Sequence, residues 1–140
     1  MKQFEYIHTV SFEETNLVGN VYFANYVKWQ GVCRERFLKE HVHDVLEDMK
    51  NGLALITLNC SCNYLSELRA FDEVRICMYL ERIQQNRISM SFEYYKIGET
   101  ENDILVAKGK HEIGCFRRQE SGLIPVEVPQ KFKSKLELYV

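Results

Sequence analysis

The chain has 140 residues with a formal net charge of −2, and its hydrophobic and charged fractions are 46% and 27%. A chain of this size buries roughly 68–70% of its unfolded surface, so we expect one domain over residues 1–140. No clustered basic face is evident, which argues against nucleic-acid binding. No apolar run approaches the ~18 residues that cross a bilayer, and the first ten residues lack a signal-peptide core, so we expect a cytoplasmic protein without a membrane partner.

The chain has five cysteines, an odd number, and is large enough to fold without disulfide bonds. Both facts favour free thiols in a reducing compartment. We expect all of them to be buried as small apolar side chains. No C-x-x-C pair occurs, so no metal site is expected, and nothing in the sequence calls for a cofactor. The cysteines are Cys33, Cys60, Cys62, Cys77 and Cys115.

The chain begins with a predicted strand and continues into a predicted long helix. Residues 2–12 alternate between apolar and polar side chains, as a half-buried strand does. In the polar loop that follows, we expect Glu13 and Glu14 to be solvated or to cap a helix. From residue 22 to residue 40 apolar side chains recur every three or four positions, which predicts a helix capped by Asn20. Its buried face would carry Tyr22, Tyr26, Trp29, Cys33 and Phe37.

The second half of the chain is predicted to be mostly strands. A shorter helix over 41–51 should stop at Gly52. Alternation then predicts strands over 57–64, 74–80, 88–94 and 104–116, and their short connections favour an antiparallel meander. A glycine inside the last strand, Gly109, indicates a place where another group approaches closely. From Pro125 onward the pattern is weak and suits a last turn of helix. The fold class is α+β, with one long helix on a sheet of about five strands.

Two polar side chains, Gln30 and Arg34, fall on the apolar side of the predicted helix. A buried arginine needs a partner, because an unpaired buried charge is very costly. Three interpretations stay open at this point. Arg34 forms an ion pair with Glu13, Glu14 or another chain; it extends its head to solvent; or it serves a functional site.

The segment ETNLVGNVYFANYVKWQGVCRERF, residues 14–37, resembles the first-helix region of hotdog-fold thioesterases in the 4-hydroxybenzoyl-CoA thioesterase superfamily. Within that group it is most similar to the enediyne polyketide thioesterases. Residues 70–74 and 105–109 resemble strand starts of the same fold, and 124–129 resembles its end, so the resemblance covers nearly the whole chain. It implies a helix wrapped by a curved antiparallel sheet, dimers that join two sheets, a site at the subunit interface, and dimers of dimers.

The resemblance also implies an activity. The enediyne branch releases a linear polyene β-ketoacyl chain from the acyl carrier domain of an iterative polyketide synthase, and the β-keto acid then decarboxylates to a conjugated methyl ketone. Where the wider group has a catalytic carboxylate, this chain has Asn16, as the enediyne branch does. An amide cannot act as a general base or nucleophile at neutral pH, so a carboxylate mechanism is not expected.

The resemblance leads to a hypothesis for the catalytic residues. Asn16 would orient water and bond the thioester, and Arg34 would stabilise the oxyanion or the released carboxylate. Tyr26 would donate its hydroxyl to the substrate carbonyl, with plain core packing as the alternative. Amides at the start of the helix, residues 21–23, would add positive charge. The expected walls of the substrate channel are Val21, Tyr22, Trp29, Tyr64 and Leu65.

Other activities were weighed against this hypothesis. A general acyl-CoA thioesterase would use the same fold with a different pocket, and a non-catalytic acyl-binding protein would also lack the carboxylate. A hotdog dehydratase is disfavoured, because none of the four histidines matches the required motif. Cys33 is disfavoured as a nucleophile, because a thiol among aromatic side chains has a raised pKa and is inert.

Overall fold

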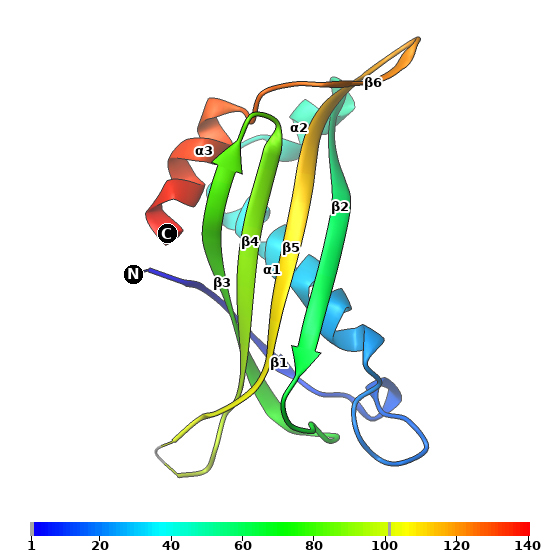
Figure 1. The fold of residues 1–140 in the computed structure, drawn as a ribbon, viewed down its shortest axis with the longest axis vertical. Coiled ribbons are helices and arrows are strands. Elements are labelled where there is room, and N and C mark those ends of the chain that lie inside the picture. The colour runs from blue at the N-terminus through cyan, green and yellow to red at the C-terminus, as the bar shows by residue number, and fades with distance from the viewer. Residues whose placement is uncertain (1, 101) are drawn as a thin grey trace.

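A computed structural model describes residues 2–100 and 102–140. It has one antiparallel sheet that curves around a long central helix, with two shorter helices at the sheet ends (Figure 1). The elements are β1 (Phe4–Thr9), η1 (Phe12–Glu14), α1 (Ala24–His41), α2 (Val45–Lys50), β2 (Leu53–Tyr64), β3 (Glu73–Gln84), β4 (Arg87–Lys96), β5 (Ile104–Gln119), β6 (Gly122–Pro125), α3 (Gln130–Leu136) and η2 (Glu137–Tyr139). The predicted α+β fold is confirmed.

The sheet order is β1-β3-β4-β5-β2, and β6 forms a hairpin with β5. The predicted meander is confirmed for β3, β4 and β5, which follow one another through short turns. It is wrong for β2, because β2 pairs with β5 and not with β3. The segment 65–72 carries the chain past the end of the sheet, so that β2 and β3 lie on opposite sides of the β4–β5 pair (Figure 1). β2 is therefore an edge strand.

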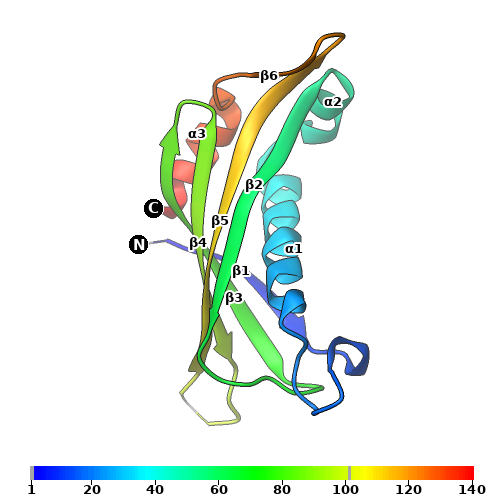
Figure 2. The same ribbon diagram turned by 45° about the vertical axis from the view of Figure 1, so that its right-hand side comes forward.

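The α1 helix lies along one face of the sheet and supplies much of the core (Figure 2). Its buried face repeats every three or four residues, as predicted, and consists of Tyr26, Trp29, Gln30, Cys33 and Phe37. The helix begins at Ala24, so Tyr22 precedes it and is 47% exposed, contrary to expectation. The predicted cap is also wrong. Phe23 occupies that position without a side-chain hydrogen bond, and Asn20 donates to Glu67 instead.

The remaining helices follow the predicted pattern in part. Gly52 adopts φ +105° directly after α2, which confirms it as the stop of that helix. The predicted last turn of helix is α3, whose Phe132 and Leu136 pack into the core. Among the residues described, no helix combines the length and apolar character needed to cross a membrane.

All five cysteines are free thiols, as expected. Burial is confirmed for Cys33, Cys77 and Cys115, but it is wrong for Cys60, which is exposed, and Cys62 is only half-buried. Both of the latter lie on β2. The middle of this strand, residues 57–61, is exposed, and among the described residues β2 has a strand neighbour on one side only. Alternation in the sequence therefore does not indicate a buried face here.

Candidate functional site

A cavity of about 270 Å³ lies at the amino-terminal end of α1, and Asn16, Val21, Tyr26 and Tyr64 are among its lining residues. Asn16 opens the tight turn in this loop. Its carbonyl accepts from the Gly19 amide at 2.9 Å, and its side-chain Oδ1 accepts from the Val18 amide at 3.0 Å. Among the described residues Asn16 Nδ2 makes no hydrogen bond, so Asn16 can offer the cavity this donor.

The loop that carries Asn16 is organised by the buried carboxylate of Glu14. Its oxygens accept from the Ser11 amide at 2.9 Å, His8 Nε2 at 2.7 Å and Trp29 Nε1 at 2.8 Å. Burial alone would raise the Glu14 pKa, but these hydrogen bonds outweigh burial and hold the pKa below its usual value. Glu14 caps η1, as expected, yet the prediction that it is solvated is wrong, since it is 5% exposed.

The backbone of Glu14 also fastens the loop to α1. Its carbonyl accepts from the Tyr22 amide and from Asn25 Nδ2, each at 2.9 Å, while the Val21 amide donates to the Leu68 carbonyl at 2.8 Å. The amides of Val21 and Tyr22 are thus already bonded within the protein. These two N–H groups are therefore not free to donate to an oxyanion, and the expected positive charge near residues 21–23 stays a prediction.

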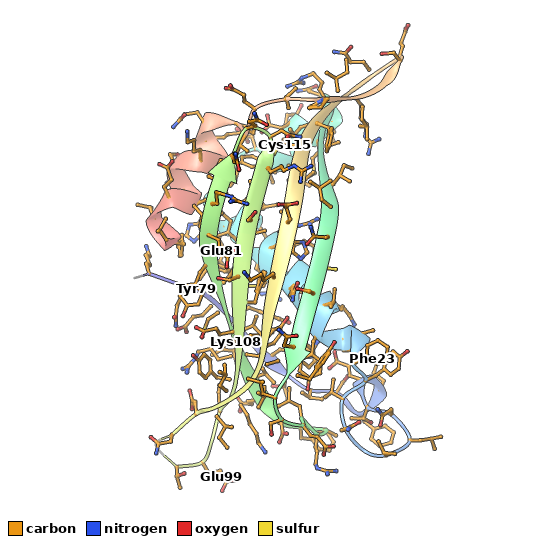
Figure 3. The ribbon with its side chains drawn as sticks, in the orientation of Figure 1. Phe23, Tyr79, Glu81, Glu99, Lys108 and Cys115 are labelled. Atoms are coloured by element: carbon orange, nitrogen blue, oxygen red, sulfur yellow. The ribbon has the colours of Figure 1, made fainter. Side chains whose placement is uncertain are left out.

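Tyr26 is buried at the inner end of the same cavity, 3% exposed, and its ring packs edge-on against Tyr64 with centroids 4.8 Å apart. Burial raises the pKa of Tyr26 to about 12, so its hydroxyl stays protonated and can donate. The Tyr64 hydroxyl donates to the Phe23 carbonyl at 2.9 Å, which fixes the end of β2 to the start of α1 (Figure 3 labels Phe23). Leu65 is exposed beside this cavity, whereas Trp29 is held in the core by Glu14.

Arg34 lies further along α1, and its head reaches the inner face of the sheet beside β2. Its Nη1 donates to Thr57 Oγ1 at 2.9 Å and lies 3.0 Å from His111 Nε2. Among the described residues it forms no ion pair, so the predicted partnership with Glu13 or Glu14 is wrong within the chain. Its Nε atom is buried, and it has no hydrogen-bond partner among the residues that the structure describes.

His111 and Gln30 are buried next to Arg34, 4% and 0% exposed. Burial, followed by the nearby charge of Arg34, lowers the pKa of His111 to about 4, so the imidazole is neutral at physiological pH. His111 Nδ1 lies 3.1 Å from Gln30 Oε1, and Gln30 Nε2 donates to the Ser61 carbonyl at 3.0 Å. Gln30 is the group that approaches Gly109, where an added Cβ would lie 2.1 Å from Gln30 Nε2. The predicted close approach at this glycine is confirmed.

Neither Gln30 nor His111 was expected to belong to the site. A signal for them was present, because Gln30 interrupts an apolar helix face and Gly109 and His111 occupy alternate positions on one strand. The pattern did not reveal that these two faces meet.

Arg34 also lies at one end of an open groove of about 680 Å³ between α1, α2 and the start of β2. Half of its twelve lining residues are apolar, and the other half are charged or polar. The apolar ones are Leu38, Val42, Val45, Leu46, Met49 and Leu55.

Within one chain, Asn16 and Arg34 line separate cavities. The eleven residue steps from Phe23, the N-cap of α1, to Arg34 correspond to about 17 Å of helix at 1.5 Å per residue. A pairing of these two residues therefore requires two copies of the chain. The Asn16 cavity also contains a carboxylate, that of Glu67, so the expectation that no acid borders the site is wrong. Glu67 is bonded to Asn20 and Arg69.

Comparison with known proteins yields a match of residues 10–136 to the model of the thioesterase-like superfamily. The chain is similar over 99% of its length to the dynemicin thioesterase, at 44% identity and a TM-score of 0.94, covering 97% of that chain. The crystal structures of that thioesterase were described in terms of polyene binding with induced-fit and allosteric effects.

Two further proteins are similar at lower identity. The 1,4-dihydroxy-2-naphthoyl-CoA hydrolase of Thermosynechococcus vestitus is 25% identical over 134 residues, which is 95% of this chain and 90% of that protein. The 4-hydroxybenzoyl-CoA thioesterase of Pseudomonas sp. strain CBS-3 is 14% identical with a TM-score of 0.82, covering 96% of this chain and 99% of that one. The latter likeness concerns the fold alone.

Proposed function

Because the chain belongs to the thioesterase-like superfamily and is an acyl thioester hydrolase, as its sequence predicted, we propose that its active site forms between two copies of the chain. In this proposal Arg34 of one subunit faces Asn16 and Tyr26 of the other. The substrate is a polyene β-ketoacyl chain on the acyl carrier domain of an iterative enediyne polyketide synthase.

The exposed edge of β2 supports the pairing of two copies. In the part of the chain that the structure describes, one side of β2 bonds β5 and its other side has no strand neighbour. Long edge strands without proline are templates for pairing with another chain, and exposed Leu58 and Cys60 give this edge apolar character. Two copies that pair through the same strand do so about a twofold axis, and their β2 strands are then antiparallel.

The contacts of β2 indicate which register would complete the site. Thr57 binds Arg34 near one end of the strand, and Tyr64 borders the Asn16 cavity near the other end. Counting the extra residue at the register shift between Thr57 and Asn59, a twofold axis at Ser61 sets Thr57 opposite Tyr64 of the partner subunit. Arg34 then faces the partner's Asn16 cavity, and the groove beside Arg34 continues into that cavity. The same arrangement occurs twice per dimer.

The proposed chemistry uses donors aimed at the thioester carbonyl. Asn16 Nδ2 and the Tyr26 hydroxyl donate to the carbonyl oxygen, and the guanidinium of Arg34 stabilises the negative charge that develops when water attacks the carbonyl carbon. The C–S bond then breaks, and the carrier thiol leaves with a proton. Arg34 next binds the β-keto carboxylate, which loses carbon dioxide and leaves an enolate. The enolate carbon takes a proton from water to give the conjugated methyl ketone.

The groove beside Arg34 supports a long apolar acyl chain. Its volume of about 680 Å³ lies within the range of roughly 300–1,000 Å³ that is usual for ligand sites. Six of its twelve lining residues are apolar, and a polyene chain would lie against them between α1 and α2 with its thioester at Arg34. The 44% identity to the dynemicin thioesterase, whose structures concern polyene binding, further supports this substrate class.

The experiment measures thiol release from a carrier-bound polyene β-ketoacyl chain and from simple acyl-CoA esters. The proposal predicts preference for the carrier-bound chain and a loss of about 100- to 1,000-fold in kcat for Arg34→Ala, the usual cost of losing one oxyanion donor. Arg36→Ala is the matched control, because Arg36 lies on the same helix and its guanidinium rests on the Tyr6 ring. A fully active Arg34→Ala enzyme would refute the assignment.

A general acyl-CoA thioesterase is the second candidate, favoured by the 25% identity to a 1,4-dihydroxy-2-naphthoyl-CoA hydrolase. Faster turnover of aryl- or acyl-CoA esters than of the carrier-bound chain would select it.

Assembly into dimers of dimers belongs to our proposal and is tested by light scattering. The free thiols support a reducing, cytoplasmic location.

A further inference from the structure

Three hydrogen bonds connect Arg34 to the backbone of β2 through two buried side chains. Arg34 Nη1 contacts His111 Nε2 at 3.0 Å, His111 Nδ1 contacts Gln30 Oε1 at 3.1 Å, and Gln30 Nε2 contacts the Ser61 carbonyl at 3.0 Å. The first two links join α1 to β5, and the third joins α1 to β2. The chain of bonds therefore crosses the interior between the helix and the sheet.

The direction of every bond in this chain is determined by its ends. A guanidinium can only donate, so His111 Nε2 must accept and carries no proton. The neutral ring therefore keeps its proton on Nδ1, which donates to Gln30 Oε1. The Ser61 carbonyl can only accept, so Gln30 presents its NH₂ group to it, which agrees with the orientation of Oε1 toward His111. All links are satisfied only with this histidine tautomer and this amide orientation.

The same bonds decide which donors Arg34 has left for substrate. Nη1 has two N–H groups, and both are used, one by His111 Nε2 and one by Thr57 Oγ1. Within residues 2–100 and 102–140, Nε has no partner and Nη2 makes no hydrogen bond. Because Nε is enclosed by the chain, Nη2 is the nitrogen that is left to donate to an oxyanion or a carboxylate.

We propose that His111 and Gln30 are positioning residues for Arg34, which hold Nη1 against the sheet so that the Nη2 donors remain available to the thioester oxygen. This inference rests on the proposed function, because it presumes that Arg34 acts on substrate. His111 acts as a neutral acceptor and does not exchange protons with the substrate. Gly109 makes the arrangement sterically possible, because any side chain at that position would displace the Gln30 amide.

Two substitutions of His111 separate positioning from packing. In His111→Gln the side-chain amide oxygen can reach the place of Nε2 and accept from Arg34, whereas in His111→Asn the shorter side chain retains only a group near Nδ1. Loss of one hydrogen bond to a charged group predicts a fall of about 10- to 100-fold in kcat for His111→Asn, with KM changed less than about 3-fold. His111→Gln should retain at least about one third of wild-type kcat.

His41→Asn is the matched control, because His41 bonds Tyr139 at 3.1 Å far along α1 and should leave kcat unchanged. Equal activities of His111→Asn and His111→Gln would overturn the inference. If Arg34→Ala is inactive while His111→Asn equals wild type, only the positioning role fails; if Arg34→Ala is fully active, the proposed function fails as well.

A spectroscopic measurement on the wild-type enzyme does not depend on how the variants fold. Nitrogen-15 NMR of the histidine rings should show His111 as the neutral tautomer with the proton on Nδ1 and none on Nε2 at pH 7. A proton on Nε2 would contradict the chain of bonds, because two donors would then face each other between His111 and Arg34.

Discussion

Replacing Gly109 with alanine should destabilise the protein and impair catalysis through the same contact. The added Cβ would lie 2.1 Å from Gln30 Nε2 and 2.9 Å from the Ser61 carbonyl oxygen, and Gln30 is fully buried. The Gln30 amide must leave its place, so its bonds to Ser61 and His111 are lost. Arg34 would then lose the support that fixes its head.

The expected magnitude follows from the two costs of that displacement. Crowding a packed interior costs about 1–3 kcal/mol, and leaving a buried amide unsatisfied costs about 1–3 kcal/mol more. For 140 residues the entropy of unfolding is about 0.29 kcal/mol per kelvin near the melting temperature. The melting temperature of Gly109→Ala should therefore fall by about 7–20 °C.

Gly31, which follows Gln30 on α1, provides the control. An added Cβ at Gly31, within α1, would meet no heavy atom within 4 Å among the described residues. Alanine is preferred over glycine inside a helix by about 0.5–1 kcal/mol, so Gly31→Ala should melt about 2–3 °C higher. Calorimetry measures both variants, and thiol release compares their kcat values. The reasoning is refuted if Gly109→Ala melts at or above the wild-type temperature with full activity.

Three further outcomes are expected. Glu14→Gln should lower the free energy of unfolding in urea by about 2–4 kcal/mol, because an amide NH₂ would face a buried N–H donor; an unchanged midpoint would contradict the role of Glu14. Glu67→Gln should keep kcat within about 3-fold, and a loss of about 100-fold would instead assign the general base to this carboxylate. Because the His111 pKa is about 4 when folded and 6.5 in its usual state, the unfolded chain binds more protons between these values. Stability should fall as pH drops through that window and be insensitive to His111 above it, and His111→Gln should reduce the slope.

Periodicity in the sequence was sufficient to predict most of the fold. The steps of three and four residues along α1 identified the buried positions Tyr26, Trp29, Cys33 and Phe37 before their neighbours were known. The pairing of β2 could not be predicted in this way. Alternation describes which side of a strand is buried, but it carries no information on which strand lies beside it, and β2 is exposed on both faces.

The candidate site was predicted only where a residue was unusual for its place in the pattern. Arg34 on an apolar helix face and Gly109 inside a strand were such residues, and both proved to have specific contacts. Glu14 gave no such signal, because a carboxylate in a polar loop is common. Its burial depends on the contact of this loop with Trp29, which the sequence pattern does not reveal. His111 could not be assigned to the site without the sheet register. That register places His111 of β5 beside Gln30 of α1.

The account depends most on a site shared between subunits, and mixed oligomers test it directly. Asn16→Ala and Arg34→Ala proteins, each nearly inactive alone, are unfolded together, refolded and assayed for thiol release. If each site takes Arg34 from one subunit and Asn16 from the other, half the dimers are mixed and each contains one intact site. Activity should then return to about one quarter of the wild-type value. If both residues act within one subunit, no mixed dimer contains an intact site, and the mixture would stay as inactive as the separate variants.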